Sequence, residues 1–207
     1  MSDEKRPYRM KQRAESQERT RLRITEAAVE LHGSVGPART SISALAQRAG
    51  VRRSTVYRHF PDEPSLLAAC SAHFVSRNPY PDPGAWAAVA DPDQRLHTAL
   101  RELYGHYGRV AQMMENLLRD AATEPVVQAQ LAGFRGYLEA CTQVLMAGRR
   151  SRGRARRRVE AAVGHALAFP TWRSLVREQG LSESDAVRLM AALVNAAGGA
   201  AQPAKPL

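Results

Sequence analysis

The hydrophobic positions between Thr40 and Phe60 predict two short helices separated by a glycine. Gly50 can adopt the left-handed conformation that ends a helix, and Thr40 or Ser41 precedes the first repeat as a candidate N-cap. The first of these predicted helices has apolar residues at i, i+3, i+4 and i+7: Ile42, Leu45, Ala46 and Ala49. The segment therefore predicts a helical hairpin that bends at Gly50.

The second helix of this hairpin should run from Arg53 to Phe60 and face inwards through Val56 and Phe60, with Val51 as an apolar plug between the two helices. A helix–turn–helix lays its second helix in the major groove, where hydroxyls and cations reach base edges and phosphates. The outward side of this helix has such residues: Arg52, Arg53, Ser54, Thr55, Tyr57, Arg58 and His59. The pattern favours a DNA-reading unit, although charge alone fits an ordinary hairpin with a solvated basic face equally well.

The turn AGV, the hydroxyl pair after it and the closing run TVYRHF closely resemble the DNA-binding domain of the TetR family of transcriptional regulators. The family's start of Thr, Ser or Thr, and an apolar residue is matched by Thr40, Ser41 and Ile42. The resemblance implies double-stranded DNA as partner, with phosphate contacts from the positions of Thr55, Tyr57 and His59. It places Phe60 in the core.

Two positions depart from the family's pattern. Arg52 and Arg53 stand where a small Ser and a variable residue are common, and Pro64 stands where a Lys typically touches phosphate. Pro64 suits the first turn of a helix, so the helix after the hairpin should persist. The Lys contact is lost, and we expect Arg52 or Arg53 to compensate for it.

The N-terminal 18 residues are polar and show no apolar period, which predicts a flexible basic arm over residues 1–18. Such an arm either reaches a minor groove or phosphates, or is a disordered solubilising tail; both interpretations stay open. Its basic residues are Lys5, Arg6, Arg9, Lys11 and Arg13. A helix from about Ser16 to His32, with Leu22, Ile24, Ala28 and Leu31 on its apolar face, should complete a three-helix head over residues 19–63.

A fourth helix over residues 64–77 should link this head to a second domain. Its apolar stripe is Leu66, Leu67, Cys70 and Phe74. Residues 78–93 contain four prolines and a glycine, which predicts a linker with a short helical piece around Trp86. We expect this helix to convert the ligand state of the second domain into the orientation of the head.

Residues 78–197 predict a helical second domain, so the fold class is all-α: a three-helix helix–turn–helix head plus a helical ligand-binding and dimerisation domain. The expected helices are 94–107, 109–122, 125–147, 155–178 and 182–197, followed by a disordered tail over 198–207. The last helix has an apolar face of Ala186, Leu189, Met190, Leu193 and Val194. The TetR resemblance implies that the last two helices pair with their copies in a homodimer; alternatively, they only bury each other within one chain.

The second domain also has aromatic and polar residues that could surround a small-molecule effector, or could be ordinary core. His165 either orients a ligand or is a satisfied core histidine. The candidate ligand-binding residues are Trp86, Tyr104, Tyr107, Met113, Met114, Phe134, Tyr137, His165, Phe169 and Trp172, with Asn116 and Met146 as further candidates.

The net charge of +10 favours a polyanionic partner, nucleic acid first. Of 30 basic residues only Lys5, Lys11 and Lys205 are lysine, which leaves 27 arginines in an alanine-rich chain; such a bias also arises from codon usage. The densest cluster comprises Arg149, Arg150, Arg152, Arg154, Arg156, Arg157 and Arg158. A charge run of this kind usually is a solvated loop leading into a helix, with a weak phosphate or membrane contact as the alternative.

Sequence signatures of enzymes are missing: there is no P-loop, G-x-S-x-G, H-E-x-x-H or G-x-G-x-x-G. We expect no catalysis, no cofactor and no metal. Cys70 and Cys141 lie on apolar stripes without C-x-x-C spacing, which predicts buried inert thiols rather than redox sensors. With no signal peptide and no long apolar run, a cytoplasmic protein without a membrane partner is expected.

The combined prediction is a ligand-responsive, DNA-binding transcriptional regulator, a repressor that a small-molecule effector releases from a pseudo-palindromic operator. One alternative is a sequence-tolerant nucleoid or architectural DNA-binding protein without an effector. Another is an enzyme or carrier on a helical scaffold with a vestigial head. If random duplex competes as well as cognate duplex, the protein is an architectural binder rather than a specific regulator. Turnover of a small molecule without DNA binding would instead identify the enzyme or carrier.

Overall fold

The computed structural model describes residues 5–198, and side chains from residue 10 onwards. The described part of the chain is helical and contains no strand. It divides into two compact units, which we call the head unit (residues up to 79, with 112–131) and the second unit (80–111, with residues from 132). The all-α prediction is confirmed.

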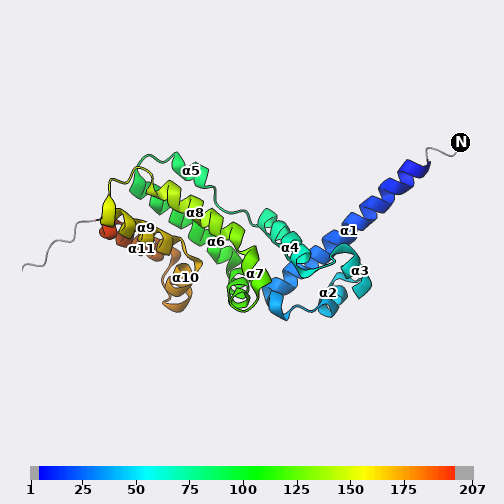
Figure 1. Ribbon diagram of the computed structural model, residues 1–207. Helices are drawn as coiled ribbons and strands as arrows, with labels where there is room; N and C mark the ends of the chain where they lie inside the picture. The colour runs from blue at the N-terminus through cyan, green and yellow to red at the C-terminus, as the bar shows by residue number, and fades with distance from the viewer. Residues whose placement is uncertain (1–4, 199–207) are drawn as a thin grey trace, which may run out of the picture. The chain divides into compact units, whose positions relative to one another are not determined.

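The head unit packs helix α1 against α2, α3 and α4, as Figure 1 shows. Its core consists of buried apolar side chains from all four helices, among them Ile24, Leu45, Val56 and Leu66. The helical elements are α1 (Lys5–Ser34), the 3-10 turn η1 (Pro37–Arg39), α2 (Ile42–Ala49), α3 (Arg53–His59), α4 (Glu63–Arg77), the end of α6 and α7 (Pro125–Gln130).

The first helix begins earlier than expected, at Lys5 rather than near Ser16. Residues 5–18 are therefore helical instead of a flexible arm, because this stretch is rich in Arg, Lys, Gln, Glu and Ala, which favour helix, and Pro7 falls in the first turn, where proline is tolerated. Residues 1–4 of the expected arm and 199–207 of the expected tail lie outside the described residues.

The apolar face expected for α1 is partly wrong, since Leu22 is 44% exposed while Ile24 and Ala28 are fully buried. Ala27 and Thr25 complete the buried face instead. The buried positions are therefore adjacent pairs about one helical turn apart, 24–25 and 27–28. This buried face is rotated by about one residue from the face that would include Leu22.

The described part of the second unit combines the start of α6 with five further helices and one π-helical turn. Its elements are α5 (Pro83–Ala87), α6 (Pro92–Ala121, of which residues 92–111 belong here), α8 (Ala132–Met146), α9 (Gly153–Leu167), α10 (Phe169–Trp172), a π-helical turn (Arg173–Glu178) and α11 (Glu183–Gly198). α9 packs against both α8 and α11. The buried Leu96, Leu100, Leu103 and Leu145 lie in its core.

Three expected helix boundaries are wrong. Helix α6 is continuous over Pro92–Ala121 instead of breaking at Gly108, because one interior glycine costs only about 1 kcal/mol relative to alanine. The helix expected over 125–147 is divided at Leu131, where the amide bonds to the carbonyl of Gln128 three residues back. Neither a glycine nor a proline marks that tightening.

The helix expected over 155–178 ends at Leu167, because Pro170 has no N–H to continue the ladder. Two carbonyls of the last turn of α9 then accept side-chain hydrogen bonds from α6. The Tyr104 hydroxyl donates to Ala166 O at 3.0 Å, and the Tyr107 hydroxyl donates to Leu167 O at 2.6 Å. These two bonds hold the break between α9 and α10 against α6.

The search for membrane-spanning segments among residues 5–198 finds no helix that is both long and apolar enough. The same residues contain no group of three or more His, Cys, Asp or Glu side chains suited to holding a metal ion.

Candidate nucleic-acid interface

Helix α2 begins and ends as its sequence predicts. The Ser41 hydroxyl accepts a hydrogen bond from the Ala44 amide at 3.1 Å, so Ser41 is the N-cap, while the Thr40 hydroxyl donates to Gly36 O at 2.8 Å. Gly50 adopts φ 63° and ψ 39°, the left-handed conformation. The amides of Gly50 and Val51 bond to Gln47 O and Ala46 O, which are the two bonds of a Schellman motif.

The outward face of α3 is accessible. Val56 is fully buried and Phe60 is 2% exposed, so the apolar side of the helix lies in the core as expected. Exposed side chains are Arg52, Arg53, Ser54, Tyr57 and Arg58, while Thr55 and His59 are half-buried. None of the three arginines forms an ion pair with a described residue, so their guanidinium groups are available to phosphates.

The end of α3 is held by Arg21 of α1, a residue that the helical period only places outside the apolar face. Its guanidinium donates to His59 O at 2.7 Å and lies 4.2 Å from the centre of the Phe60 ring. Both contacts fix the C-terminus of α3 against α1. Periodicity does not reveal them, because they join residues 38 positions apart.

His59 is neutral near pH 7, since burial and the neighbouring charges of Arg58 and Arg21 lower the pKa of its imidazole. Its Nε2 atom is shielded from solvent and has no hydrogen-bond partner. A phosphate contact from His59 therefore requires the side chain to turn outwards, whereas Tyr57 needs no such change because it is 48% exposed.

The start of α4 accommodates Pro64. Asp62 is the N-cap and its carboxylate accepts a hydrogen bond from the Ser65 amide at 2.8 Å, so Pro64 falls in the first turn of α4. Proline at this position loses no helical hydrogen bond. The bonds from Ser65 lower the pKa of the exposed Asp62 carboxyl.

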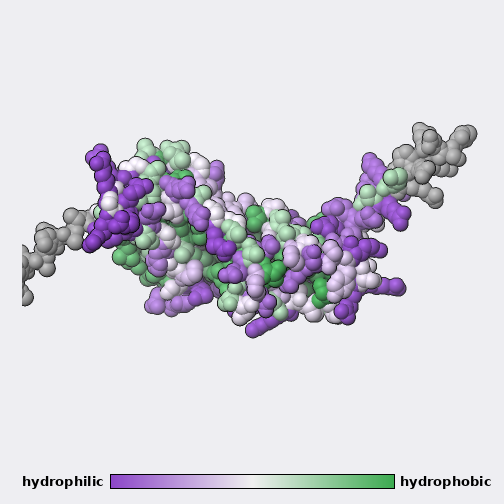
Figure 2. Space-filling view, viewed as in Figure 1, coloured by the Kyte–Doolittle hydropathy of each residue, from purple (hydrophilic) through white to green (hydrophobic). Residues whose placement is uncertain are grey.

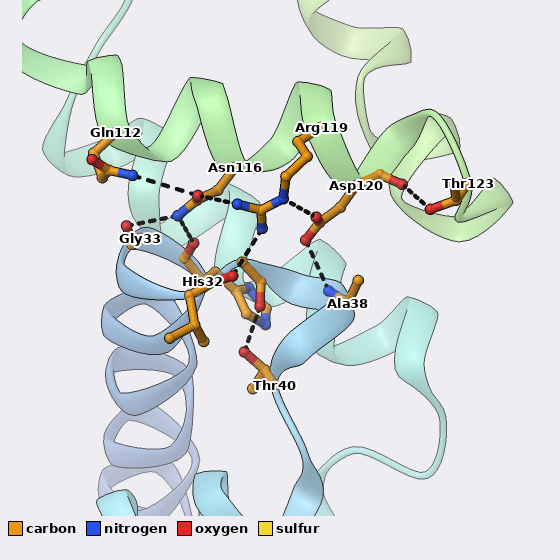
Figure 3. Close-up of polar contacts among 11 residues, drawn as sticks. His32, Gly33, Ala38, Thr40, Gln112, Asn116, Arg119, Asp120 and Thr123 are labelled. Carbon is orange, nitrogen blue, oxygen red and sulfur yellow. Dashed lines mark hydrogen bonds and ion pairs between the residues drawn. The ribbon is translucent and has the colours of Figure 1, made fainter.

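The last turns of α6 hold the segment that leads into the helix–turn–helix, through three residues that we call the α6 clamp: Asn116, Arg119 and Asp120 (Figure 3). The Asn116 amide donates to His32 O at 2.9 Å and Gly33 O at 2.8 Å, two carbonyls at the end of α1. The Arg119 guanidinium donates to Val35 O, at 2.8 Å, and to the clamp's own Asn116 and Asp120. These hydrogen bonds satisfy backbone carbonyls at the end of α1 and just after it, where a helix leaves its last carbonyls without partners.

The same clamp reaches η1. The Asp120 carboxylate, which is 4% exposed, accepts a hydrogen bond from the Ala38 amide at 3.0 Å. Gly36 lies between, with φ 97°, and a Cβ there would collide with the side chains of Arg119 and Asp120. The backbone from α1 to α2 is therefore positioned by α6, which the sequence pattern did not predict.

Comparison with protein families gives a match between residues 24–70 and the family described as bacterial regulatory proteins, tetR family. This range contains α2, α3, the N-terminal half of α4 and the end of α1. Residues 24–70 of this chain therefore match the DNA-binding domain of the TetR family. The head of the chain is the DNA-binding domain of a transcriptional regulator, as the resemblance predicted.

Solved structures of TetR-type regulators share the fold over most of their length. A TetR-like regulator from Rhodococcus sp. RHA1 is 20% identical with a TM-score of 0.63, covering 87% of this chain and 97% of its own. A TetR-family regulator from Mesorhizobium loti is 19% identical, with a TM-score of 0.61 and coverage of 87% and 96%. FadR from Bacillus subtilis in complex with stearoyl-CoA is 16% identical, with a TM-score of 0.59 and coverage of 84% and 96%. Comparison with curated proteins finds no match.

In the second unit, six of the ten candidate ligand residues form one aromatic cluster. They are Tyr104, Tyr107, Phe134, Tyr137, Phe169 and Trp172. Tyr80 joins the cluster by stacking on Tyr137 at 4.7 Å between ring centres, although its place in a proline-rich loop gave no sign of this. The indole N–H of Trp172 is buried and has no hydrogen-bond partner.

The other four candidates lie elsewhere. Met113 and Met114 belong to the head unit, where Met113 approaches Gly33, and Trp86 donates its indole N–H to Glu102 at 2.7 Å. His165 is exposed, and its ring lies 3.4 Å from the Thr171 hydroxyl. Of the two further candidates, Asn116 belongs to the α6 clamp and Met146 is buried on α8.

The arginine run is mostly solvated, as expected, with one exception. Arg149 is half-buried and donates to Leu145 O, Pro92 O and the carboxylate of Asp93, so it ties α8 to the start of α6. The other six arginines are exposed, and Figure 2 shows hydrophilic residues gathered over the start of α9.

Both cysteines are buried, and burial raises the pKa of the Cys70 thiol to about 12 and that of Cys141 to about 11. Their thiols are therefore protonated and weakly reactive near pH 7.

Proposed function

We propose that this TetR-family chain is a homodimeric repressor that a small-molecule effector releases from a pseudo-palindromic operator in the cytoplasm, without enzymatic activity. The observation that carries the DNA-binding part is the outward face of α3. Three arginines without ion pairs and an exposed Tyr57 lie there on a helix whose opposite side is fully packed. Such a surface neutralises phosphates and reaches base edges.

Support for a homodimer comes from α11. Its buried face comprises Ala186, Met190 and Val194, whereas Leu189 and Leu193 are 41% and 51% exposed. Two exposed leucines one turn apart are an apolar stripe that a second copy can cover. Two heads related by a two-fold axis would read half-sites about 34–36 Å apart, so the operator should be pseudo-palindromic.

Support for an effector comes from the aromatic cluster of the second unit. Three of its tyrosine hydroxyls are occupied: Tyr104 and Tyr107 bond to α9, and Tyr137 donates to Pro81 O at 3.0 Å. The unpartnered indole N–H of Trp172 remains as a donor within an apolar surround. An apolar molecule that presents one acceptor oxygen suits such a site. The stearoyl-CoA bound to FadR shows that a protein of this fold can hold an acyl ligand.

The proposed coupling runs along α6. Residues 92–111 of this helix carry Tyr104 and Tyr107 of the aromatic cluster, and residues 116–120 carry the α6 clamp. A change in the packing of Tyr107 on effector binding would shift the register of the clamp against the α1–η1 turn. The effector and the operator would then each favour one state, with a coupling free energy of about 1–3 kcal/mol.

The test begins with purified protein and fragments of its own genome. Fragments that it retains are sequenced, and a gel-shift with labelled fragment is competed with unlabelled fragment and with random duplex. A regulator prefers its selected fragments by about a thousandfold or more. Equal competition by random duplex would instead identify an architectural binder. Sedimentation of the wild type and of Leu189→Glu/Leu193→Glu then tests whether α11 forms the dimer, with Glu139→Gln at an exposed position of α8 as a control.

A further inference from the structure

The head unit contains a groove of about 600 Å³ beside the recognition helix. It lies between the start of α2, the end of α3 and the first turns of α4, with Glu124 at its edge. Thr40, Ser41 and Tyr57, all expected to touch DNA, line it. Volumes of several hundred cubic ångströms are typical of small-molecule sites.

The floor of this groove is apolar. Leu45, Phe60, Leu66 and Leu67 line it, and each of these side chains is at most 6% exposed to solvent. They belong to the packed core of the head, so the floor is a preformed surface rather than a gap between mobile chains. Each Å² of apolar surface that a ligand buries on this floor would favour binding by about 25 cal/mol.

The rim of the groove is acidic, which sets it apart from the rest of a chain with net charge +10. Asp62, Glu63 and Glu124 line it, and no lysine or arginine does. The Ser65 bonds that lower the pKa of the Asp62 carboxyl keep that group ionised. Three carboxylates without a cation among the lining residues favour a positively charged guest.

A histidine also lines the groove. His32 lines it and is 5% exposed, yet its imidazole has no hydrogen-bond partner among the described residues. Burial lowers the pKa of His32 to about 4, so the ring is neutral and one nitrogen can accept a hydrogen bond. A buried ring with an unused acceptor suits a guest that carries an N–H donor.

We propose that this groove binds a small amphiphilic cation, an ammonium group on an apolar body, and that the bound cation competes with DNA. The apolar body covers Leu66 and Phe60, and the ammonium lies at the carboxylate rim. Competition follows because the same groove is lined by Ser41 and Tyr57, whose approach to phosphate the guest would obstruct. This site lies within the head and is separate from the effector site proposed for the second unit.

The binding test uses three compounds of one shape and different charge: 4-phenylbutylamine, 4-phenylbutanol and 4-phenylbutyrate, titrated calorimetrically into the full chain without DNA. We expect the amine to bind at least tenfold more tightly than the alcohol, and the butyrate not at all. Equal binding of all three, or preference for the butyrate, would overturn the proposal.

Variants then locate the site. Glu63→Gln/Glu124→Gln should weaken the amine at least tenfold and leave the alcohol unchanged, whereas the control Glu15→Gln/Glu18→Gln, which removes the same charge from exposed positions of α1, should have no effect. Unchanged affinity for the amine in the first variant would overturn the location, and would assign the binding to another part of the chain such as the aromatic cluster.

The competition is tested separately with an operator duplex. The amine should raise the apparent Kd for DNA in the wild type and not in Glu63→Gln/Glu124→Gln. An amine that binds the groove and leaves DNA affinity unchanged would overturn the competition. Because calorimetry contains no DNA, failure of the repressor proposal would leave the binding result intact.

Discussion

The head unit and the second unit use polar side chains in opposite ways. On the head, Arg52, Arg53 and Arg58 are solvent-facing and form no ion pair with any described residue. In the second unit, the buried hydroxyls of Tyr104 and Tyr107 bond to backbone carbonyls. Unpaired charge on a surface is available to a partner, whereas paired polar groups in a core fix the packing. The unpaired charges of the head therefore suit it to bind a polyanion, whereas the paired polar groups of the second unit fix how its helices pack.

The largest expected effect is on DNA binding by the head. Arg53→Ala and Tyr57→Ala should each weaken operator binding by about 1–3 kcal/mol, because each removes a proposed DNA contact. Fluorescence anisotropy at fixed salt measures the loss, and circular dichroism should show unchanged helix content. Arg101→Ala, which removes an exposed charge from the second unit, should change affinity little. If both head variants bind as wild type, α3 is not the DNA surface.

The next effect is the pH dependence of the head's stability. Burial lowers the pKa of His32 to about 4 from 6.5 in the unfolded chain. Because the unfolded state takes up the proton first, stability is complete above pH 6.5 and falls as pH decreases towards 4, by about 3 kcal/mol.

Chemical denaturation between pH 7.5 and 4.5 measures this slope. His32→Gln should flatten it even if the variant is less stable overall, because glutamine does not titrate. In contrast, the buried tyrosines of the second unit have their pKa raised by burial and stay protonated across this range, so Tyr107→Phe should keep the wild-type slope. A slope that survives in His32→Gln would assign it to other groups.

Loss of one buried hydrogen bond should destabilise the second unit more than the head. Tyr107→Phe leaves Leu167 O without its donor in a fully buried position and should cost about 1–3 kcal/mol. Tyr57→Phe removes a hydroxyl that is exposed in the head and should change stability by less than about 0.5 kcal/mol. Urea unfolding compares the two, and equal effects would remove the distinction drawn between the units.

The smallest expected effect concerns the α6 clamp. Asn116→Ala frees two carbonyls at the end of α1 and should destabilise the head by about 1 kcal/mol. Gln112→Ala removes only a 3.4 Å contact from an exposed side chain and is the matched control. Operator affinity should fall less than tenfold in the first variant and not in the second. If the two behave alike, the clamp does not position the helix–turn–helix.

The reliability of the sequence-based predictions differs between the two units for a physical reason. In α2 and α3, the caps, the left-handed Gly50 and the apolar spacing act within about one helical turn, so residues close in sequence reveal them. The second unit depends on contacts across the fold. Its candidate ligand residues could be chosen by side-chain type. Helical periodicity could not predict that His165 is exposed to solvent, or that Tyr80 stacks on Tyr137 in the aromatic cluster.

The sequence by itself determined the all-α class, the helix–turn–helix with its Gly50 turn and a cap at Thr40 or Ser41, and the resemblance that the family match confirms. These follow from local hydrogen bonding and from side-chain volume along one helix. Only the tertiary structure decided that Arg21 holds α3, that α6 clamps the α1–η1 turn, and that an acidic groove lies beside Tyr57. Each of these joins residues far apart in the chain, and the free energy of such contacts depends on distances that no sequence period encodes.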